Sequence, residues 1–176
     1  MLLFMHLFLY AISFAQEWKI ESAKVNFEIE NFGSTVTGSF SDVKVSVVFN
    51  PSNIAASSVN ATIKVSSINT GNKTRDKHLK GEEYFNEASY EEIFFKSTEI
   101  LPTSQKDKYI VNGDLTIKGV SKDVSIHFVF QEKEKAGMFS AILNLNRLDY
   151  KVGSSSWILG DEVKVTIELS TIKMTK

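Results

Sequence analysis

The stretch KYIVNGDLTIKGVSKDVSIHFVF (residues 108–130) decides the fold. Apolar side chains take every second position on both sides of Lys118-Gly119, from Val111 to Ile117 and from Val124 to Phe130. A period of two is typical of a β-strand with one buried face, and glycine between two such runs is typical of a tight turn. The stretch therefore predicts an antiparallel hairpin with one apolar face.

The same alternation extends over most of the chain and predicts about eight strands. Its phase reverses between Phe40 and Val43, which either a bulge at Ser41-Asp42 in one long strand or two separate strands would explain. An antiparallel β-barrel is the simplest architecture for such a series, and an eight-stranded barrel leaves room for side chains or one slender ligand. The other alternating segments are 25–29, 36–40, 43–49, 59–65, 93–97, 139–145 and 163–169.

One interval, residues 71–89, lacks the alternation and predicts a short helical insertion near residues 72–85. Thr74 is the expected N-cap of a helix over residues 75–80, which Gly81 would end. A closed barrel offers an apolar surface to such an insertion mainly at its open end. We therefore expect a mouth or lid that includes Arg75, His78, Leu79, Tyr84 and Phe85.

The first fifteen residues are typical of an export signal. Met1–Phe14 is almost wholly apolar, and Ser13 and Ala15 are small residues at the positions that a signal peptidase reads. No Lys or Arg precedes the apolar run, which is unusual for such a signal, and an uncleaved membrane anchor is the alternative. The run is short for a bilayer span of about 20 residues. We expect a single domain over residues 16–176 in a periplasmic or secreted protein.

Composition excludes several classes of function. The 20 basic and 21 acidic residues give a net charge of -1, so no overall positive charge favours nucleic acid or an anionic surface. The absence of cysteine excludes disulfides, thiol nucleophiles, thiolate metal sites and a lipid-modified cysteine. Packing alone must therefore hold the domain together.

Small residues at inward-facing strand positions predict a cavity. Gly38, Ala61, Gly113 and Ala141 occupy positions where a filled core would more often carry larger side chains. The alternative is that large neighbours close over them. The predicted cavity lining comprises Phe27, Val36, Gly38, Phe40, Ala61, Ile63, Phe95, Val111, Gly113, Leu115, Ile126, Phe128, Ala141 and Leu143.

A charged pair stands in LNRLDY (residues 145–150), where an apolar run ends. Arg147 and Asp149 stand two residues apart, a spacing that places both on the same face of a strand. A buried pair would be mutually compensated. Either it fixes the barrel end, or Arg147 contacts the polar head group of a ligand.

No residue pattern indicates catalysis, a metal or a cofactor. Arg75, Asp76 and His78 cluster in the insertion, but a metal site needs three or more convergent ligands, and a solvated helix face is the simpler interpretation. The sequence contains no Gly-x-Ser-x-Gly elbow, zinc-protease motif or glycine-rich phosphate loop. We expect a protein that is not an enzyme.

A series of short motifs follows in order along the chain. They are Trp18-Lys19-Ile20 with Ser22, Val25-x-Phe27, Val36-x-Gly38-x-Phe40, Ser67-Ile68-Asn69-Thr70-Gly71, Arg75-Asp76-x-His78-Leu79, Tyr84-Phe85, Ile93-Phe94-Phe95-Lys96-Ser97, residues 109–120, Arg147-x-Asp149-Tyr150 and Gly160-x-Glu162-Val163. Their order resembles the YceI-like family of exported bacterial lipid-binding proteins. The resemblance implies a lipocalin-like antiparallel barrel whose elongated cavity takes a polyisoprenoid chain, as in isoprenoid quinones, with no enzymatic activity.

Two positions depart from the family pattern: Lys151, where glycine is frequent, and Leu143, where a small residue is frequent and a leucine would shorten the cavity. We expect a carrier of an isoprenoid-like or other long-chain lipid. The alternatives are a structural or stress-response protein with a filled barrel and, disfavoured by the missing nucleophile motif, a lipid hydrolase. Nucleic acid is not an expected partner, and the oligomeric state, including a homodimer, is left open.

Overall fold

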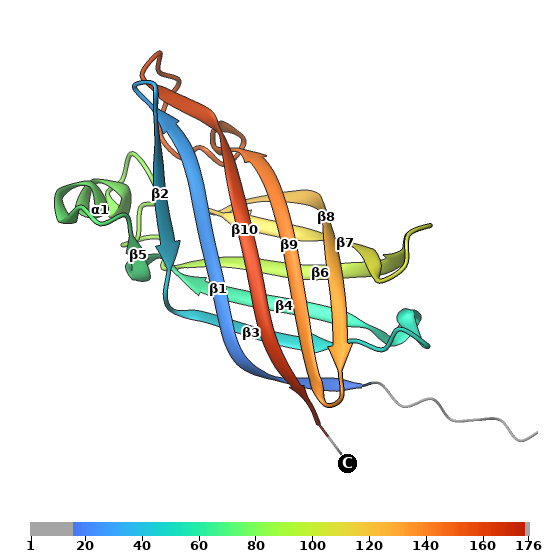
Figure 1. The fold of residues 1–176 in the computed structure, drawn as a ribbon. Helices are drawn as coiled ribbons and strands as arrows, with labels where there is room; N and C mark the ends of the chain where they lie inside the picture. Colours follow the sequence, from blue (N-terminus) through green and yellow to red (C-terminus); the bar gives the residue numbers. More distant parts are fainter. Residues whose placement is uncertain (1–15, 175–176) are drawn as a thin grey trace, which may run out of the picture.

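A computed structural model describes residues 16–174, and the predicted export signal lies outside them. These residues form ten β-strands, one α-helix and three short 3-10 turns (Figure 1). The strands are β1 (Glu17–Asn31), β2 (Ser34–Phe40), β3 (Val43–Val48), β4 (Ser58–Lys64), β5 (Ile68–Asn69), β6 (Glu92–Pro102), β7 (Lys108–Ile117), β8 (Val120–Lys133), β9 (Ala136–Asn146) and β10 (Leu159–Lys173). The helix is α1 (Lys73–Lys80), and the turns are η1 (Ile54–Ala56), η2 (Val65–Ser67) and η3 (Arg147–Tyr150).

Eight of the strands close into an antiparallel barrel. The order β1-β3-β4-β6-β7-β8-β9-β10 is closed by pairing of β10 with β1, from Trp18 opposite Lys173 to Asn31 opposite Leu159. Strands β2 and β5 extend the sheet beside the second half of β1. The predicted all-β barrel with a short helical insertion is confirmed.

The phase reversal after Phe40 marks a break between two strands, β2 and β3. Of the two alternatives, two separate strands is therefore correct, and a bulge in one long strand is not. Strands β2 and β3 both pair with β1 in one continuous register. Phe40 lies opposite Val25 and Val47 lies opposite Trp18, and the two pairs are seven residues apart both along β1 and along the β2–β3 segment. Strand β1 has its own irregularity against β10 between Ile20 and Ser22. Strand β1 and the β2–β3 segment therefore both change, between these two pairs, which set of alternate residues points inward. Because they change together, the inside of the barrel stays apolar.

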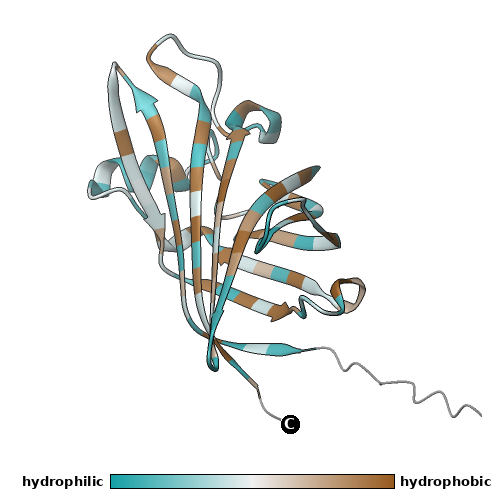
Figure 2. Cartoon of the chain, turned by 45° about the vertical axis from the view of Figure 1, so that its right-hand side comes forward, coloured by the Kyte–Doolittle hydropathy of each residue, from teal (hydrophilic) through white to brown (hydrophobic). Residues whose placement is uncertain are grey.

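The hairpin of β7 and β8 has the predicted form. Every second residue of β7, from Tyr109 to Ile117, is buried and its neighbours are not. Figure 2 shows hydrophobic and hydrophilic residues alternating along the strands. Ile117 pairs with Val120 across the turn. Lys118 and Gly119 have φ of 48° and 71°, as in a type I′ turn, whose twist matches that of paired strands.

An aromatic cluster fills one end of the barrel. The fully buried Phe49 ring, just beyond the end of β3, makes edge-to-face contacts with four rings from β7, β8 and β9. The centroid distances are 5.0 Å to Tyr109, 5.6 Å to Phe128, 4.9 Å to Phe130 and 5.6 Å to Phe139. Trp18 at the start of β1 donates its indole N–H to the Phe49 carbonyl at 2.8 Å. We call this group, Trp18, Phe49, Tyr109, Phe128, Phe130 and Phe139, the aromatic plug.

The helix within the insertion begins two residues earlier than the sequence predicted. Asn72, not Thr74, is the N-cap, because its side-chain oxygen accepts hydrogen bonds from the backbone N–H of Thr74 and Arg75 at 3.0 and 3.1 Å. Asparagine is at least as favourable an N-cap residue as threonine, which agrees with the earlier start. Gly81 follows the helix as expected, with an extended backbone at φ −69°.

Replacement of the central ring should test the plug. We expect Phe49→Ala to lower the free energy of unfolding by about 3–5 kcal/mol, since it empties a fully buried site and removes four ring contacts. Urea denaturation measures the loss. Phe32→Ala, at a ring that is 72% exposed, is the matched control and should change stability by less than about 0.5 kcal/mol. Equal losses in both variants would contradict this role of the plug.

Candidate functional site: an apolar cavity below a polar rim

The barrel encloses a cavity of about 260 Å³. Aliphatic and aromatic side chains from all eight barrel strands form its wall. Twelve of the fourteen predicted lining residues lie on this wall, and their contact with a ligand stays a prediction. They are Phe27, Val36, Phe40, Ala61, Ile63, Phe95, Val111, Leu115, Ile126, Phe128, Ala141 and Leu143.

The two predicted glycines, Gly38 and Gly113, do not line the cavity, and that part of the prediction is wrong. A Cβ at Gly38 would overlap the ring of Phe27, its cross-strand partner. A Cβ at Gly113 would overlap the Lys96 carbonyl and the ring of Phe95. Both glycines make room for a neighbouring ring, so the alternative that large neighbours close over small residues holds at these two positions.

Polar side chains meet the cavity at the end opposite the aromatic plug. Trp18 in the plug and Asn31 on the cavity wall stand at the two ends of β1. Residues from the other segments that reach this end come from the β5–α1 loop, α1, the loop after α1, and η3. We call this end the polar rim; its members are Asn31, Thr70, Arg75, Tyr84, Arg147 and Tyr150.

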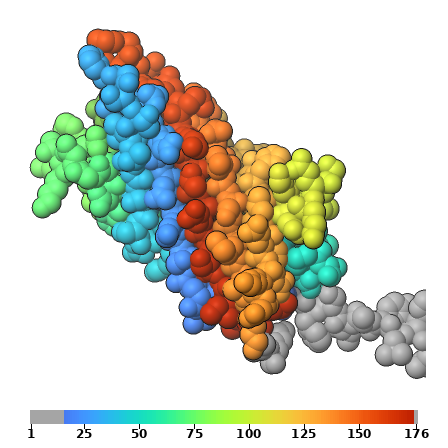
Figure 3. Space-filling view, in the orientation of Figure 1, coloured from blue at the N-terminus to red at the C-terminus, as the bar shows by residue number. Residues whose placement is uncertain are grey.

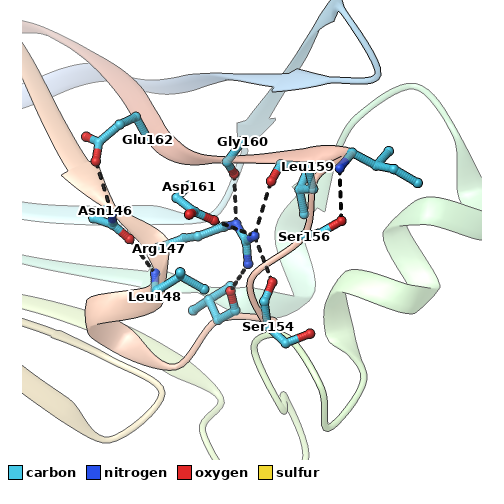
Figure 4. A network of polar contacts seen from close by, with 11 residues as sticks. Asn146, Arg147, Leu148, Ser154, Ser156, Leu159, Gly160, Asp161 and Glu162 are labelled. Carbon is cyan, nitrogen blue, oxygen red and sulfur yellow. Dashed lines mark hydrogen bonds and ion pairs between the residues drawn. The ribbon is translucent and has the colours of Figure 1, made fainter.

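Arg147 clamps the loop that joins η3 to β10 (Figure 4). The residue is 4% exposed. Its guanidinium donates from Nε to the Gly160 carbonyl and from Nη1 to the Val152 carbonyl, both at 2.9 Å. Nη2 donates to the Ser154 carbonyl at 2.9 Å and to Asp161 Oδ1 at 2.8 Å. A buried cation requires this degree of compensation, and the planar fork of arginine supplies donors in several directions.

The predicted pair of Arg147 and Asp149 is wrong. The ion partner of Arg147 is Asp161, and the Asp149 carboxylate is exposed and lies 4.0 Å from the Lys122 ammonium. The spacing misled because residues 147–150 form a 3-10 turn, so the period of two does not apply. The N–H donors of Arg147 bind groups of the protein itself. This supports the interpretation that Arg147 fixes the barrel end over the one in which it contacts a ligand head group.

The segment after β5 covers part of the cavity as a lid. Leu79, Tyr84 and Phe85 line the cavity together with Arg75, and the Phe85 ring stands edge-to-face with Phe40 at 6.1 Å. His78 is exposed and does not line the cavity, because it lies one position off the Arg75–Leu79 face of α1. The prediction assigns His78 to the mouth or lid and not to the cavity wall, and a role for it there stays a prediction.

A hydrogen-bond network holds α1 against β5, and the sequence did not indicate its centre, Thr70. The Asp76 carboxylate accepts from the Thr70 backbone N–H at 2.9 Å and from its hydroxyl at 2.6 Å. Arg75 donates from Nε to Thr70 Oγ1 at 2.8 Å and from Nη2 to the Thr70 carbonyl at 2.7 Å. The hydrogen bonds from Thr70 hold the pKa of Asp76 below its ordinary value.

Lys118 joins two segments of the rim and is a second residue that the sequence did not single out. Its ammonium, in the β7–β8 turn, donates to the carbonyls of Glu83 and Lys151 at 2.8 and 2.7 Å. Burial lowers the pKa of Lys118. The Gly153 backbone N–H also donates to the Glu83 carbonyl, at 3.0 Å, so the lid and the loop after η3 are tied together.

Among residues 16–174, no three or more side chains of histidine, cysteine, aspartate or glutamate gather in a geometry that could hold a metal ion. No helix in the same range is long and apolar enough to cross a membrane.

A closed eight-stranded antiparallel barrel with an apolar interior and one short helix defines the lipocalin-like class of barrels. Within that class, the sequence profile of the YceI-like domain matches residues 18–171, and the chain belongs to this family. The resemblance seen in the sequence is confirmed.

Curated relatives include a UPF0312 protein of Photorhabdus laumondii, 41% identical over 108 residues, and one of Yersinia pestis, 38% identical over 117 residues. The matched parts cover 61% and 64% of this chain, and 55% and 60% of those proteins. The chain thus matches little more than half the length of these relatives.

Solved structures show the same fold. BcnA of Burkholderia cenocepacia superposes with a TM-score of 0.80 at 28% identity, over 84% of this chain and 95% of that one. The YceI protein of Campylobacter jejuni gives 0.73 at 28% identity, over 81% and 87%. A polyisoprenoid binding domain from Saccharophagus degradans gives 0.70 at 16% identity, over 92% and 100%, a likeness of fold alone.

Two double-mutant cycles should separate the predicted from the observed partner of Arg147. We expect Arg147→Ala with Asp161→Ala to show a coupling energy of about 1–3 kcal/mol, because the two residues are in contact. Arg147→Ala with Asp149→Ala should be additive within about 0.5 kcal/mol. Chemical denaturation measures all variants. Coupling in the second cycle and additivity in the first would reverse the assignment.

Asp76 should titrate at a lower pH than an ordinary aspartate. Since its folded-state pKa lies below the unfolded one, the carboxylate stabilises the docked α1 fully above the unfolded pKa, and the effect is lost as the pH falls through the folded pKa. Side-chain NMR titration measures this pKa. Thr70→Val, which removes the hydroxyl donor, should raise it part of the way to the ordinary value; an unchanged pKa in this variant would contradict the proposed cause.

Proposed function

We propose that this protein binds and carries a lipid with a long apolar tail, a polyisoprenoid or an isoprenoid quinone, and that it has no catalytic role. The observation that carries the proposal is the distribution of polarity around the cavity. Its wall is apolar from the aromatic plug upward, and polar side chains meet it at the rim. An amphiphile with an apolar chain and a small polar head has the matching distribution.

The tail supplies the affinity in this proposal. Each methylene that moves from water into an apolar environment contributes roughly 0.8 kcal/mol before ordering costs, so a prenyl chain needs no charged contact. Arg75 has donors left over after its two hydrogen bonds to Thr70 and lies on the cavity wall, where it would meet the head group. The polyisoprenoid binding domain of Saccharophagus degradans, which shares the fold, supports this ligand class.

Leu143 limits the chain length in the same proposal. Its side chain lies on the cavity wall, as the sequence predicted for a residue that would shorten the cavity. A volume of about 260 Å³ lies just below the range typical of ligand pockets, about 300–1,000 Å³. We infer that a short prenyl chain fits within the cavity and that a longer one displaces the lid. From the export signal that the sequence predicts in residues 1–15, we also propose that the carrier is periplasmic or secreted.

Organic extraction of the purified protein followed by mass spectrometry tests the proposal. We expect a prenyl lipid in near-stoichiometric yield, reduced several-fold in Ala141→Phe, whose ring would occupy the cavity. The matched control is Ile142→Phe, at the next residue of β9 on the outer face, where the side chain is 55% exposed. It should retain the ligand.

Two outcomes would contradict the proposal. An empty extract from cells that make quinones would favour the structural alternative, a protein whose cavity holds no lipid. Equal ligand content in Ala141→Phe and Ile142→Phe, with both variants folded, would place the lipid outside the barrel.

A further inference from the structure

Three apolar side chains are exposed at the far end of the rim. Phe32, in the β1–β2 turn, is 72% exposed, Trp157 is 88% exposed and Ile158 is 39% exposed. The rings of Phe32 and Trp157 lie 6.3 Å apart. We call these three residues the aromatic tip. Clustered exposed rings of this size mark a surface that another molecule or phase covers.

The backbone conformation of the β1–β2 turn does not explain why phenylalanine stands at position 32. Phe32 has φ 52° and the next residue, Gly33, φ 73°, the backbone of a type I′ turn, which favours asparagine or aspartate at the first of these positions. A bulky residue is disfavoured in this conformation. Phenylalanine thus occupies a backbone conformation that disfavours a bulky residue, and its side chain belongs to neither hydrophobic core cluster.

Hydrogen bonds and strand pairing connect the aromatic tip to the polar rim. The Phe32 backbone N–H donates to the Ile158 carbonyl at 2.7 Å, which joins the β1–β2 turn to the loop before β10. Asn31 and Leu159, each one residue from the tip, pair across β1 and β10 and line the cavity. Arg147 binds the Val152 and Ser154 carbonyls of the same loop. In Figure 3 the blue turn and the orange-red loop form one projection from the molecule.

Exposed positive charge accompanies the tip. Lys73 and Lys77 on α1, and Lys151 at the start of the tip's loop, are exposed and take part in no ion pair among the described residues. Four acidic groups near the tip have partners, whereas the exposed carboxylates of Glu82 and Glu83, near Lys118, take part in no ion pair among the described residues. Asp161 binds Arg147, Glu28 binds Lys164, Glu162 accepts from Asn146 and Glu30 accepts from Thr35. Figure 3 shows α1 and the tip protruding on the same side of the molecule.

We propose that the aromatic tip inserts into the interface of an anionic lipid bilayer, with the exposed lysines at the head groups, and that this sets the rim of the cavity onto the membrane. Tryptophan and phenylalanine favour the boundary between head groups and acyl chains, and each lysine near an anionic surface adds attraction. The inference deepens the proposed carrier function, because a lipid tail that leaves the cavity past the tip would enter the bilayer without crossing water.

The intrinsic fluorescence of Trp157 tests the insertion. The chain has two tryptophans, and Trp18 is buried in the plug, so a change on vesicle addition reports Trp157. We expect a blue shift and protection from acrylamide quenching with vesicles of phosphatidylcholine and phosphatidylglycerol. Pure phosphatidylcholine should give a weaker effect. The protein is used as purified, without added cargo.

Co-sedimentation with the same vesicles measures binding in the variants. Phe32→Ser with Trp157→Ser should weaken binding about tenfold or more, since two rings no longer leave water. Phe94→Ser is the matched control, an exposed phenylalanine on β6 that lies outside the cavity wall, and should bind like the wild type. Lys73→Gln with Lys77→Gln should lower binding to the anionic vesicles more than to pure phosphatidylcholine.

Three results would overturn the docking proposal: no spectral change with either vesicle, equal binding of the tip variant and Phe94→Ser, or a blue shift that follows protein concentration without vesicles. The last would assign the tip to a contact between two copies. The carrier function is judged separately by extraction. Vesicle binding with an empty extract would refute the carrier and keep the docking surface, and a loaded protein that ignores vesicles would do the reverse.

Discussion

The pairing of β1 with β10 is the contact on which the rest of the structure depends. Each of these fifteen-residue strands runs the length of the barrel, and their register joins the first described strand to the last. Without this closure the sheet would expose two long edges, and its apolar face would have no enclosed interior. Closure also requires neighbouring strands to point their apolar side chains inward together. Accordingly, β1 and the β2–β3 segment both switch their inward-pointing residues between the same two pairs, Val25–Phe40 and Trp18–Val47.

The two ends of the closed barrel are finished by different chemistry. At one end, rings pack on Phe49, and two of them, Phe128 and Phe139, also line the cavity. At the other, the backbone must leave the barrel through loops, and Arg147 and Lys118 satisfy the loop carbonyls with charged donors. This difference gives the cavity a direction, with an apolar base and a polar rim, and it places the exposed aromatic tip on the same side as the rim.

Strand facing could be predicted from the sequence because period-two alternation reports burial directly: the β7–β8 hairpin, the helical insertion and most of the cavity wall were found in this way. Contacts that depend on the path of the chain could not. Asp161 lies in a different element from Arg147, and the turn at residues 147–150 removed the alternation on which the Asp149 pair rested. Gly38 and Gly113 suggested open space, but the size of an inward residue does not show whether a neighbouring ring fills that space.

The most direct test of the central claim, that an apolar chain occupies the barrel interior, is the measurement of intermolecular NOEs in methyl-labelled protein loaded with a prenylated quinone. The account predicts NOEs from the chain protons to methyl groups of Ile63, Leu115 and Val165 on the cavity wall. It predicts none to Ile142 and Ile172, whose side chains are exposed. NOEs confined to the exposed methyl groups, with the cavity methyl signals unchanged on loading, would contradict it.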